Sequence, residues 1–223
     1  MNNTFLIYFI LRLLGTPISS IVIILVAIYL LDRFFIGVLP NVFAPIKRRS
    51  QIKRLENELR INPANASNAM ELGVLYFEKK RYETALGYLN KAYERMKDSD
   101  RLLLYRGMAL IENGCRNEGI DNLNKAVAIN EGTGYGLPYV YLLSDAMENT
   151  GISRTESKNL QDKFWRYANT ENLYRMGMMY KRHGDREKAR DMFDNAIKEY
   201  SYCPRNLKKL HRRWALLSRL NRI

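Results

Sequence analysis

Cysteine and histidine are the residue types that most often bind metals or carry nucleophilic and redox chemistry, and this chain of 223 residues has only two of each. Cys115 and Cys203, with His183 and His211, have neither the number nor the spacing of a zinc module or a disulfide framework. No base is evident beside either cysteine, so both are expected to be incidental thiols. The sequence therefore predicts no metal site and no cofactor.

Catalytic motifs are also missing from the sequence. It contains no Gly-rich phosphate loop, no His-Glu-x-x-His and no Gly-x-Ser-x-Gly. The composition, 47% hydrophobic and 26% charged, excludes a wholly disordered chain and a polytopic membrane protein. We therefore expect a folded protein that is not an enzyme.

The net charge of +13 is concentrated at the two ends of the chain. Residues 1–60 carry +5, residues 61–204 only +1, and residues 205–223 carry +7 without an acidic residue. A high net charge by itself suggests nucleic acid, but a neutral body between two basic ends argues for local contacts at each end. Nucleic-acid binding is therefore disfavoured, and it is kept only as an alternative for the C-terminal segment.

An apolar run near the N-terminus predicts a membrane anchor. Residues 13–31 contain no charge, and 12 of these 19 residues are Leu, Ile or Val. A helix of that length spans the ~30 Å hydrocarbon core of a bilayer. The alternative is a cleaved signal peptide, but the run is longer than a usual signal sequence and no small-x-small cleavage site follows it. We expect residues 1–32 to be a retained anchor.

The cations near the apolar run predict its orientation. Arg12 alone precedes the run, whereas Arg33 and a basic cluster follow it, so the positive-inside rule places the bulk of the chain in the cytoplasm. Residues 33–65 would then form an interfacial segment and a basic helix that leads into the body. The cluster either binds anionic lipid headgroups or only fixes the topology. It consists of Lys47, Arg48, Arg49, Lys53 and Arg54.

The body of the chain repeats a pattern of small and large apolar residues. These spacings place the side chains on the facing sides of two paired helices. The first copy has Gly73, Ala85, Leu89 and Ala92, the second, 34 residues later, has Gly107, Gly119, Leu123 and Ala126, and the last has Gly177, Ala189, Phe193 and Ala196. This pattern resembles the tetratricopeptide repeat (TPR) family.

A degenerate copy lies between the second copy and the last one. Its helices are expected at residues 138–149 and 155–165, with Leu143-Ser144 in place of the Leu-Gly pair. Its offset is 37 residues rather than 34, which a three-residue insertion in the loop at residues 132–136 explains. Turn residues at 113–114, 150–151 and 183–184 fall where the first helix of each pair should end.

The resemblance implies a right-handed superhelix of helix pairs over residues 66–203, whose first helices line a concave groove. An apolar, methionine-rich groove suits an amphipathic helix or an extended apolar segment of a protein partner. Alternatively, the same side chains are buried against neighbouring helices. The groove positions of the family fall on Met70, Val74, Phe77, Leu104, Met108, Ile111, Tyr141, Tyr174 and Met178. The Lys and Asn pair that clamps chaperone tails in co-chaperone TPR domains is not found, because Met70 and Val74 stand in those places.

Residues 204–223 are expected to form a basic helix that caps the last repeat. Its capping stripe would consist of Leu207, Leu210, Trp214 and Leu217. Another side would carry cations that either bind anionic lipid or an acidic partner, or are only solvated. These cations are Lys208, Arg212, Arg219 and Arg222.

Together these features predict an all-α protein with an N-terminal transmembrane helix, a TPR-type α-solenoid and a C-terminal capping helix. The layout resembles that of membrane-anchored bacterial TPR proteins, which implies a scaffold at the inner membrane that binds a protein or peptide partner on the cytoplasmic side. An envelope-assembly factor with its repeats outside the membrane is the alternative.

Overall fold

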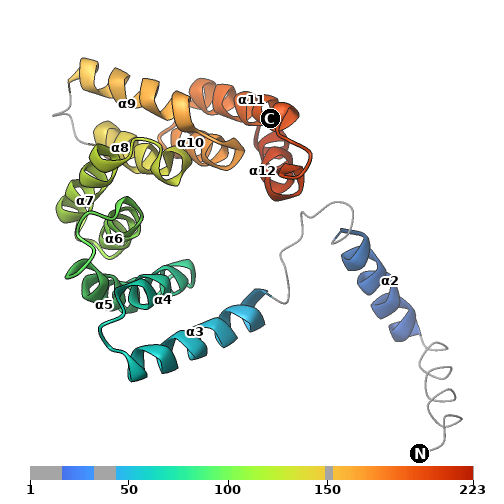
Figure 1. Ribbon diagram of the computed structural model, residues 1–223. Helices are drawn as coiled ribbons and strands as arrows, with labels where there is room; N and C mark the ends of the chain where they lie inside the picture. The colour runs from blue at the N-terminus through green and yellow to red at the C-terminus, as the bar shows by residue number, and fades with distance from the viewer. Residues whose placement is uncertain (1–16, 33–43, 149–152, 223) are drawn as a thin grey trace, which may run out of the picture.

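The computed structural model describes residues 17–32, 44–148 and 153–222, and within these residues the secondary structure is helical, without strands. Figure 1 shows the helices that follow residue 44 as a C-shaped array, with α4, α6 and α10 toward the inside and α9 and α11 toward the outside. The predicted all-α solenoid is confirmed. Its helices are α2 (Pro17–Leu31), α3 (Ala44–Ile61), α4 (Ala66–Glu78), α5 (Tyr82–Tyr93), α6 (Asp100–Glu112), α7 (Arg116–Ile129), η2 (Thr133–Gly136), α8 (Leu137–Glu148), α9 (Arg154–Tyr167), α10 (Thr170–Arg182), α11 (Arg186–Tyr202) and α12 (Lys208–Asn221).

Three glycines hold the regular helix pairs α4–α5, α6–α7 and α10–α11 together. A Cβ added at Gly73 would lie 2.5 Å from the partner leucine, and one at Gly177 would lie 2.6 Å from the ring of Phe193. At Gly107 it would lie 2.8 Å from the carbonyl oxygen of Gly119. Because no side chain fits at these distances, each glycine lets its helix pack directly against the second helix of its pair. The structure thus forms a close helix pair at each of the three predicted motif copies.

Local hydrogen bonds set where the helices begin and end. Ser99 accepts from the backbone N–H of Leu102 at the start of α6, and Ser153 forms a capping box at the start of α9. Gly114 and Gly184 have φ values of +89° and +82° and follow α6 and α10 directly after their C-caps, a conformation that glycine adopts without strain. These are two of the three predicted helix ends. The third, at 150–151, lies outside the described residues.

The degenerate pair α8–α9 matches the predicted ranges within two residues but packs differently. The insertion folds into η2, and the only buried side chain on α9 is Phe164, which lies against this turn at Gly136. The buried Asn172 of α10 donates its side-chain amide to the carbonyl oxygens of Gly134 and Tyr135, at 2.9 and 2.8 Å. The third pair therefore depends on η2 where the other pairs use a glycine contact.

Within residues 33–65, where a basic helix was expected to lead into the body, the structure has α3, which begins at Ala44. Ile52 and Leu55 are buried in one core with α4. The Tyr76 hydroxyl of α4 donates to a carboxylate oxygen of Glu56 at 2.7 Å. This hydrogen bond, with burial, raises the pKa of Tyr76 to about 12. Helix α3 thus covers the exposed side of the first repeat helix.

Helix α12 caps the array as predicted but is rotated relative to the predicted stripe. It packs on α10 and α11 through Ala215 and Ser218, which are fully or almost fully buried. Leu207 and Leu210, predicted to face inward, are 42% and 69% exposed. Small side chains let two helices approach closely, which explains why the Ala and Ser side faces inward and the leucines do not.

The predicted membrane-spanning helix is not supported. Of residues 13–31, the structure describes α2, which has 15 residues and a length of about 22 Å. The hydrocarbon core of a bilayer is ~30 Å thick. Among the described residues, no helix is both long enough and apolar enough to cross a membrane. Residues 13–16, and residues 33–43 of the predicted interfacial segment, lie outside the described residues.

Candidate functional site

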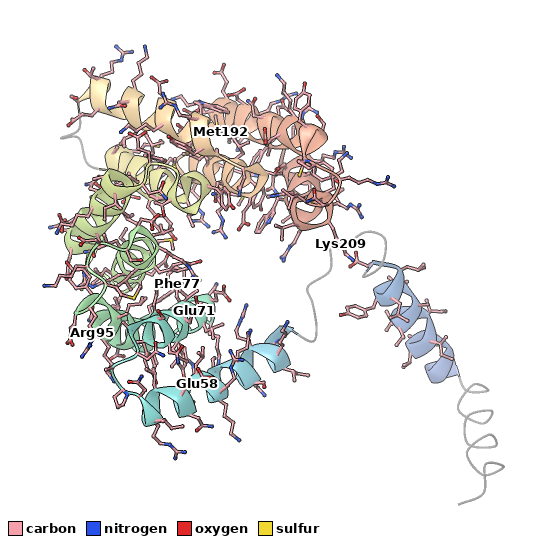
Figure 2. All side chains as sticks on the ribbon, in the orientation of Figure 1. Glu58, Glu71, Phe77, Arg95, Met192 and Lys209 are labelled. Carbon is pink, nitrogen blue, oxygen red and sulfur yellow. The ribbon has the colours of Figure 1, made fainter. Side chains whose placement is uncertain are left out.

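The inner side of the C-shaped array holds two adjoining cavities that form one groove. The larger one, of about 820 Å³, lies between α4, α6, η2, α8 and α10. The smaller one, of about 320 Å³, lies between α8, α10 and α12. The two share Leu137, Tyr141 and Arg175 in their walls. Phe77, labelled in Figure 2, lines the α4 end of this groove, and Trp214 of α12 lines its other end.

Six of the nine predicted groove residues line these cavities. They come from the first helix of each of the four pairs, as the family resemblance implies. Met108 and Leu104 are only 1% and 3% exposed and belong to the floor of the larger cavity. The six are Phe77, Leu104, Met108, Tyr141, Tyr174 and Met178.

The other three predicted groove residues lie away from the groove. Met70 is buried in one core with Ile52 of α3, because α3 packs over the first repeat helix. Val74 is 5% exposed and lines neither cavity. Ile111 points toward α7, since its Cγ1 atom is 2.5 Å from the position a Cβ on Gly119 would take.

Several groove residues were not anticipated from the sequence. Tyr105 and Arg175 stand two residues before the motif glycines of their helices, a shared register that could have identified them. Asn172 belongs to the wall near η2, and Leu137 comes from the start of α8. Trp214 was placed only in the capping stripe. No periodic signal links α12 to the groove, because it is not part of a repeat.

The groove wall is aromatic at both ends. The rings of Phe77 and Tyr105 are edge to face with centroids 5.8 Å apart. At the other end, the rings of Tyr174 and Trp214 have centroids 5.5 Å apart. The guanidinium carbon of Arg175 lies 5.6 Å from the Trp214 ring centroid, in cation–π distance. Rigid aromatic side chains of this kind offer large contact areas to an apolar or amphipathic ligand.

Two charged side chains in the groove wall, Arg175 and Glu112, have polar partners. Arg175 forms an ion pair with Glu171 at 2.6 Å. The Tyr141 hydroxyl is 3.5 Å from a carboxylate oxygen of Glu112, and burial together with this carboxylate raises the pKa of Tyr141 to about 12. The tyrosine therefore remains a neutral hydrogen-bond donor at physiological pH. The arrangement presents apolar and hydrogen-bonding surface.

The basic cluster on α3 is partly engaged by acidic side chains. Arg48 forms an ion pair with Glu78 of α4 at 2.8 Å, and Arg54 with Glu58 of its own helix at 3.5 Å. The other three members of the cluster are exposed on α3: Lys47, Arg49 and Lys53. The site residues predicted for anionic lipid remain a prediction.

The C-terminal cations are turned mostly toward α11. Arg222 forms an ion pair with Asp194 at 2.6 Å. The Arg212 Nε donates to the Tyr200 hydroxyl at 3.3 Å, and the Lys208 ammonium lies 5.9 Å from the centroid of the same ring. Of the four predicted cations, Arg219 alone is exposed without a contact to α11 among the described residues.

Cys115 lies directly before α7 and Cys203 directly after α11. Cys115 is exposed and Cys203 half-buried, and both are free thiols. Within the described residues, no group of three His, Cys, Asp or Glu side chains could hold a metal ion.

The fold and the groove define a helical-repeat protein with a groove along the inner side of its array. Residues 171–201 match the sequence model of the tetratricopeptide repeat, and these residues are the last of the predicted copies. A search of curated proteins finds no match to this chain. No catalytic family is indicated.

Several solved structures have a similar fold. The crystal structure of MamA is 20% identical and aligns with 74% of this chain and 97% of its own, with a TM-score of 0.51. YrrB, described as a TPR protein with an unusual peptide-binding site, is 20% identical over 77% of this chain and 86% of its own, with a TM-score of 0.50. A tetratricopeptide repeat protein from Parabacteroides merdae is 15% identical over 78% of this chain and 67% of its own, with a TM-score of 0.51. These comparisons support the resemblance to the TPR family and show a TPR-like solenoid.

Proposed function

We propose that this protein is a TPR-type scaffold that binds a segment of a protein partner in the groove between α4 and α12. The observation that carries the proposal is the continuous groove itself, with aromatic walls at both ends. An extended or helical segment of the partner would bury apolar side chains against Tyr105, Tyr141 and Tyr174. The peptide-binding site that is attributed to YrrB gives this proposal further support.

The aromatic residues at the ends of the groove would contribute most of the binding energy. Binding energy at protein interfaces is concentrated in a few well-packed residues, among which Trp, Tyr and Arg are enriched. Trp214, Tyr174 and Arg175 form such a group in the smaller cavity. Helix α12 would therefore contribute to partner binding as well as to the end of the solenoid.

The scaffold is also proposed to be tethered to a membrane, with its repeats facing the cytoplasm. Helix α2 has no charged residue, and nine of its large apolar side chains are 46% to 60% exposed. Large exposed apolar surfaces of this kind mark contact with membranes or partners. The excess of cations on the C-terminal side of the apolar run supports the cytoplasmic side.

Peptide selection followed by matched substitutions would test the groove. Random peptides displayed on phage are selected against the full chain in detergent, and their dissociation constants are then measured for the wild type and two variants. Met178→Glu places a charge in the smaller cavity and should weaken binding at least about tenfold. Tyr202→Ala removes a 74% exposed aromatic residue outside the groove and should leave binding unchanged. Equal losses in the two variants would contradict the proposed site.

Two measurements on a chain with a reporter fused after Ile223 would test the tether: flotation of the membranes from the expressing cells, and the compartment in which the reporter is active. We expect the chain to float with membranes and the reporter to be active in the cytoplasm. An exported reporter would contradict the proposed orientation and favour the envelope-assembly alternative.

A further inference from the structure

Helix α12 has two chemically different sides, and only one of them is used by the fold. Its inner side, at Ala215 and Ser218, packs on α10 and α11. Arg222 and Lys208 lie on this side as well, and each contacts α11. The cations that the sequence pattern suggested for a lipid surface are thus mostly part of the packing.

The opposite side of α12, here called the outward face, is apolar and basic at once. At 100° per residue its members lie opposite Ala215 and Ser218. Leu210 and Leu220 are 69% and 72% exposed, and the other two leucines of the face, Leu216 and Leu217, are half-buried. The outward face consists of Lys209, Leu210, Arg213, Leu216, Leu217 and Leu220. Figure 2 labels Lys209 on this helix, at the end of the array.

The charge around the outward face has one sign. Residues 205–222 carry seven Lys and Arg and no Asp or Glu. The carboxylate of Asp194, on the neighbouring α11, is engaged by Arg222. Arg213 stays exposed while its guanidinium lies 5.5 Å from the Trp214 ring centroid, and Lys209 is exposed too. An occupant of this face must therefore offer apolar contact together with a dense negative charge.

An anionic bilayer surface has both properties. In helices that lie in the membrane interface, leucines insert at the boundary between headgroups and acyl chains. The long side chains of Lys and Arg place their charges at the lipid phosphates. A second copy of this chain offers apolar contact, but its own outward face would repel this one because both are cationic. Nucleic acid offers the negative charge but no apolar surface for the exposed leucines.

We propose that the outward face of α12 lies on an anionic phospholipid bilayer, with Leu210 and Leu220 in the interface and Lys209 and Arg213 at lipid phosphates. The inference rests on the membrane location proposed above and adds a second contact to it, at the far end of the chain from α2. Such a contact would place the α12 end of the groove beside the membrane surface.

A fluorophore on α12 reports this contact separately from the tether at α2. Both proteins are the full chain with Cys115 and Cys203 changed to Ser. In the first, an environment-sensitive dye is attached to a cysteine introduced by Leu220→Cys. In the matched control, the dye is attached through Ile129→Cys on α7, where the native residue is 50% exposed. Each protein is added to phosphatidylcholine vesicles with or without phosphatidylglycerol, and co-flotation is measured in parallel. We expect a blue shift of the dye at position 220 with the anionic vesicles only, and none at position 129.

Two variants test the role of the cations. Lys209→Gln with Arg213→Gln should raise the anionic lipid concentration needed for half of the shift at least about tenfold. Arg154→Gln with Lys158→Gln removes the same charge from exposed positions on α9 and should have little effect.

Three results would overturn the inference. The first is a protein that floats with the vesicles but shows no shift at position 220, which leaves the tether at α2 intact. The second is a shift that rises with protein concentration without vesicles, which indicates self-association. The third is a shift with RNA of equal charge but not with vesicles. A protein that does not float with either kind of vesicle would contradict the tether and this inference together.

Discussion

Gly107→Ala and Gly87→Ala make the same chemical change in two helices, and Gly107→Ala should be the less stable of the two. A Cβ on Gly107 would lie 2.8 Å from the carbonyl oxygen of Gly119 and 2.9 Å from Leu123. Gly87 lies exposed within α5, and nothing is within 4 Å of a Cβ built there. In both helices alanine gains about 1 kcal/mol over glycine from helix propensity. The difference between the variants therefore isolates the close helix contact.

The size of that difference follows from what the new methyl group meets. The carbonyl oxygen of Gly119 belongs to the backbone of α7, so the contact is relieved only if α6 and α7 move apart. Overpacking of a tight contact costs about 1–3 kcal/mol. We expect Gly87→Ala to be about 1 kcal/mol more stable than the wild type, and Gly107→Ala to be about 1–3 kcal/mol less stable than Gly87→Ala.

Urea unfolding of the full chain, followed by circular dichroism in one detergent, measures the difference. The slopes of the unfolding free energy against urea concentration should agree among the three proteins, so that the midpoints compare stability directly. If Gly107→Ala proved as stable as Gly87→Ala, the close approach of α6 and α7 would be refuted, and with it the explanation of the repeat motif.

Three further changes test other parts of the structure. The Ser218 hydroxyl is fully buried with no hydrogen-bond partner among the described residues. Ser218→Ala should therefore raise the unfolding free energy, measured with urea, by about 1 kcal/mol. A lower unfolding free energy in the variant would show that this hydroxyl is hydrogen-bonded. Phe193→Ala, at a residue 1% exposed against Gly177, should cost about 3–5 kcal/mol, and a loss as small as that of a surface change would contradict the packing. Hydrogen bonds from the backbone N–H and the ammonium of Lys188 hold the pKa of Asp185 below its ordinary 3.8, so its stabilisation is present above about pH 4 and is lost as the pH falls below that value. Asp185→Asn should therefore melt with less dependence on pH below 4 than the wild type, and equal dependence would contradict the pairing.

The repeat pairs could be predicted because their constraint is local and periodic. Gly107 and Leu123 must face each other wherever two helices cross closely, so the 16-residue spacing that recurs at Gly177 and Phe193 specifies the pairing by itself. The resemblance to the TPR family implied the groove positions of Tyr141 and Met178, and both residues line the groove. The degenerate copy lacks the glycine, and it was predicted from its place between the regular copies, its expected helices and an offset that the insertion explains.

The remaining features depend on contacts between elements that the repeat does not encode. Met70 does not line the groove because α3 packs over it through Ile52. Helix α12 presents leucines on one side and small residues on another, and its sequence alone does not tell which side meets α10 and α11. The side with small residues, at Ala215, faces α10 and α11 because small side chains allow close helix packing. Because α12 packs through this side, Trp214 lines the groove, which its sequence does not predict.

Photo-crosslinking in cells tests the central claim, partner binding in the groove, most directly. A photoreactive amino acid replaces Tyr105 in the groove wall, or Lys125, an exposed residue of α7 outside it. The account predicts a discrete crosslinked species from position 105 that is lost with Met178→Glu and is not formed from position 125. Equal crosslinking from both positions, or none from position 105 in cells where the partner is captured by other means, would contradict it.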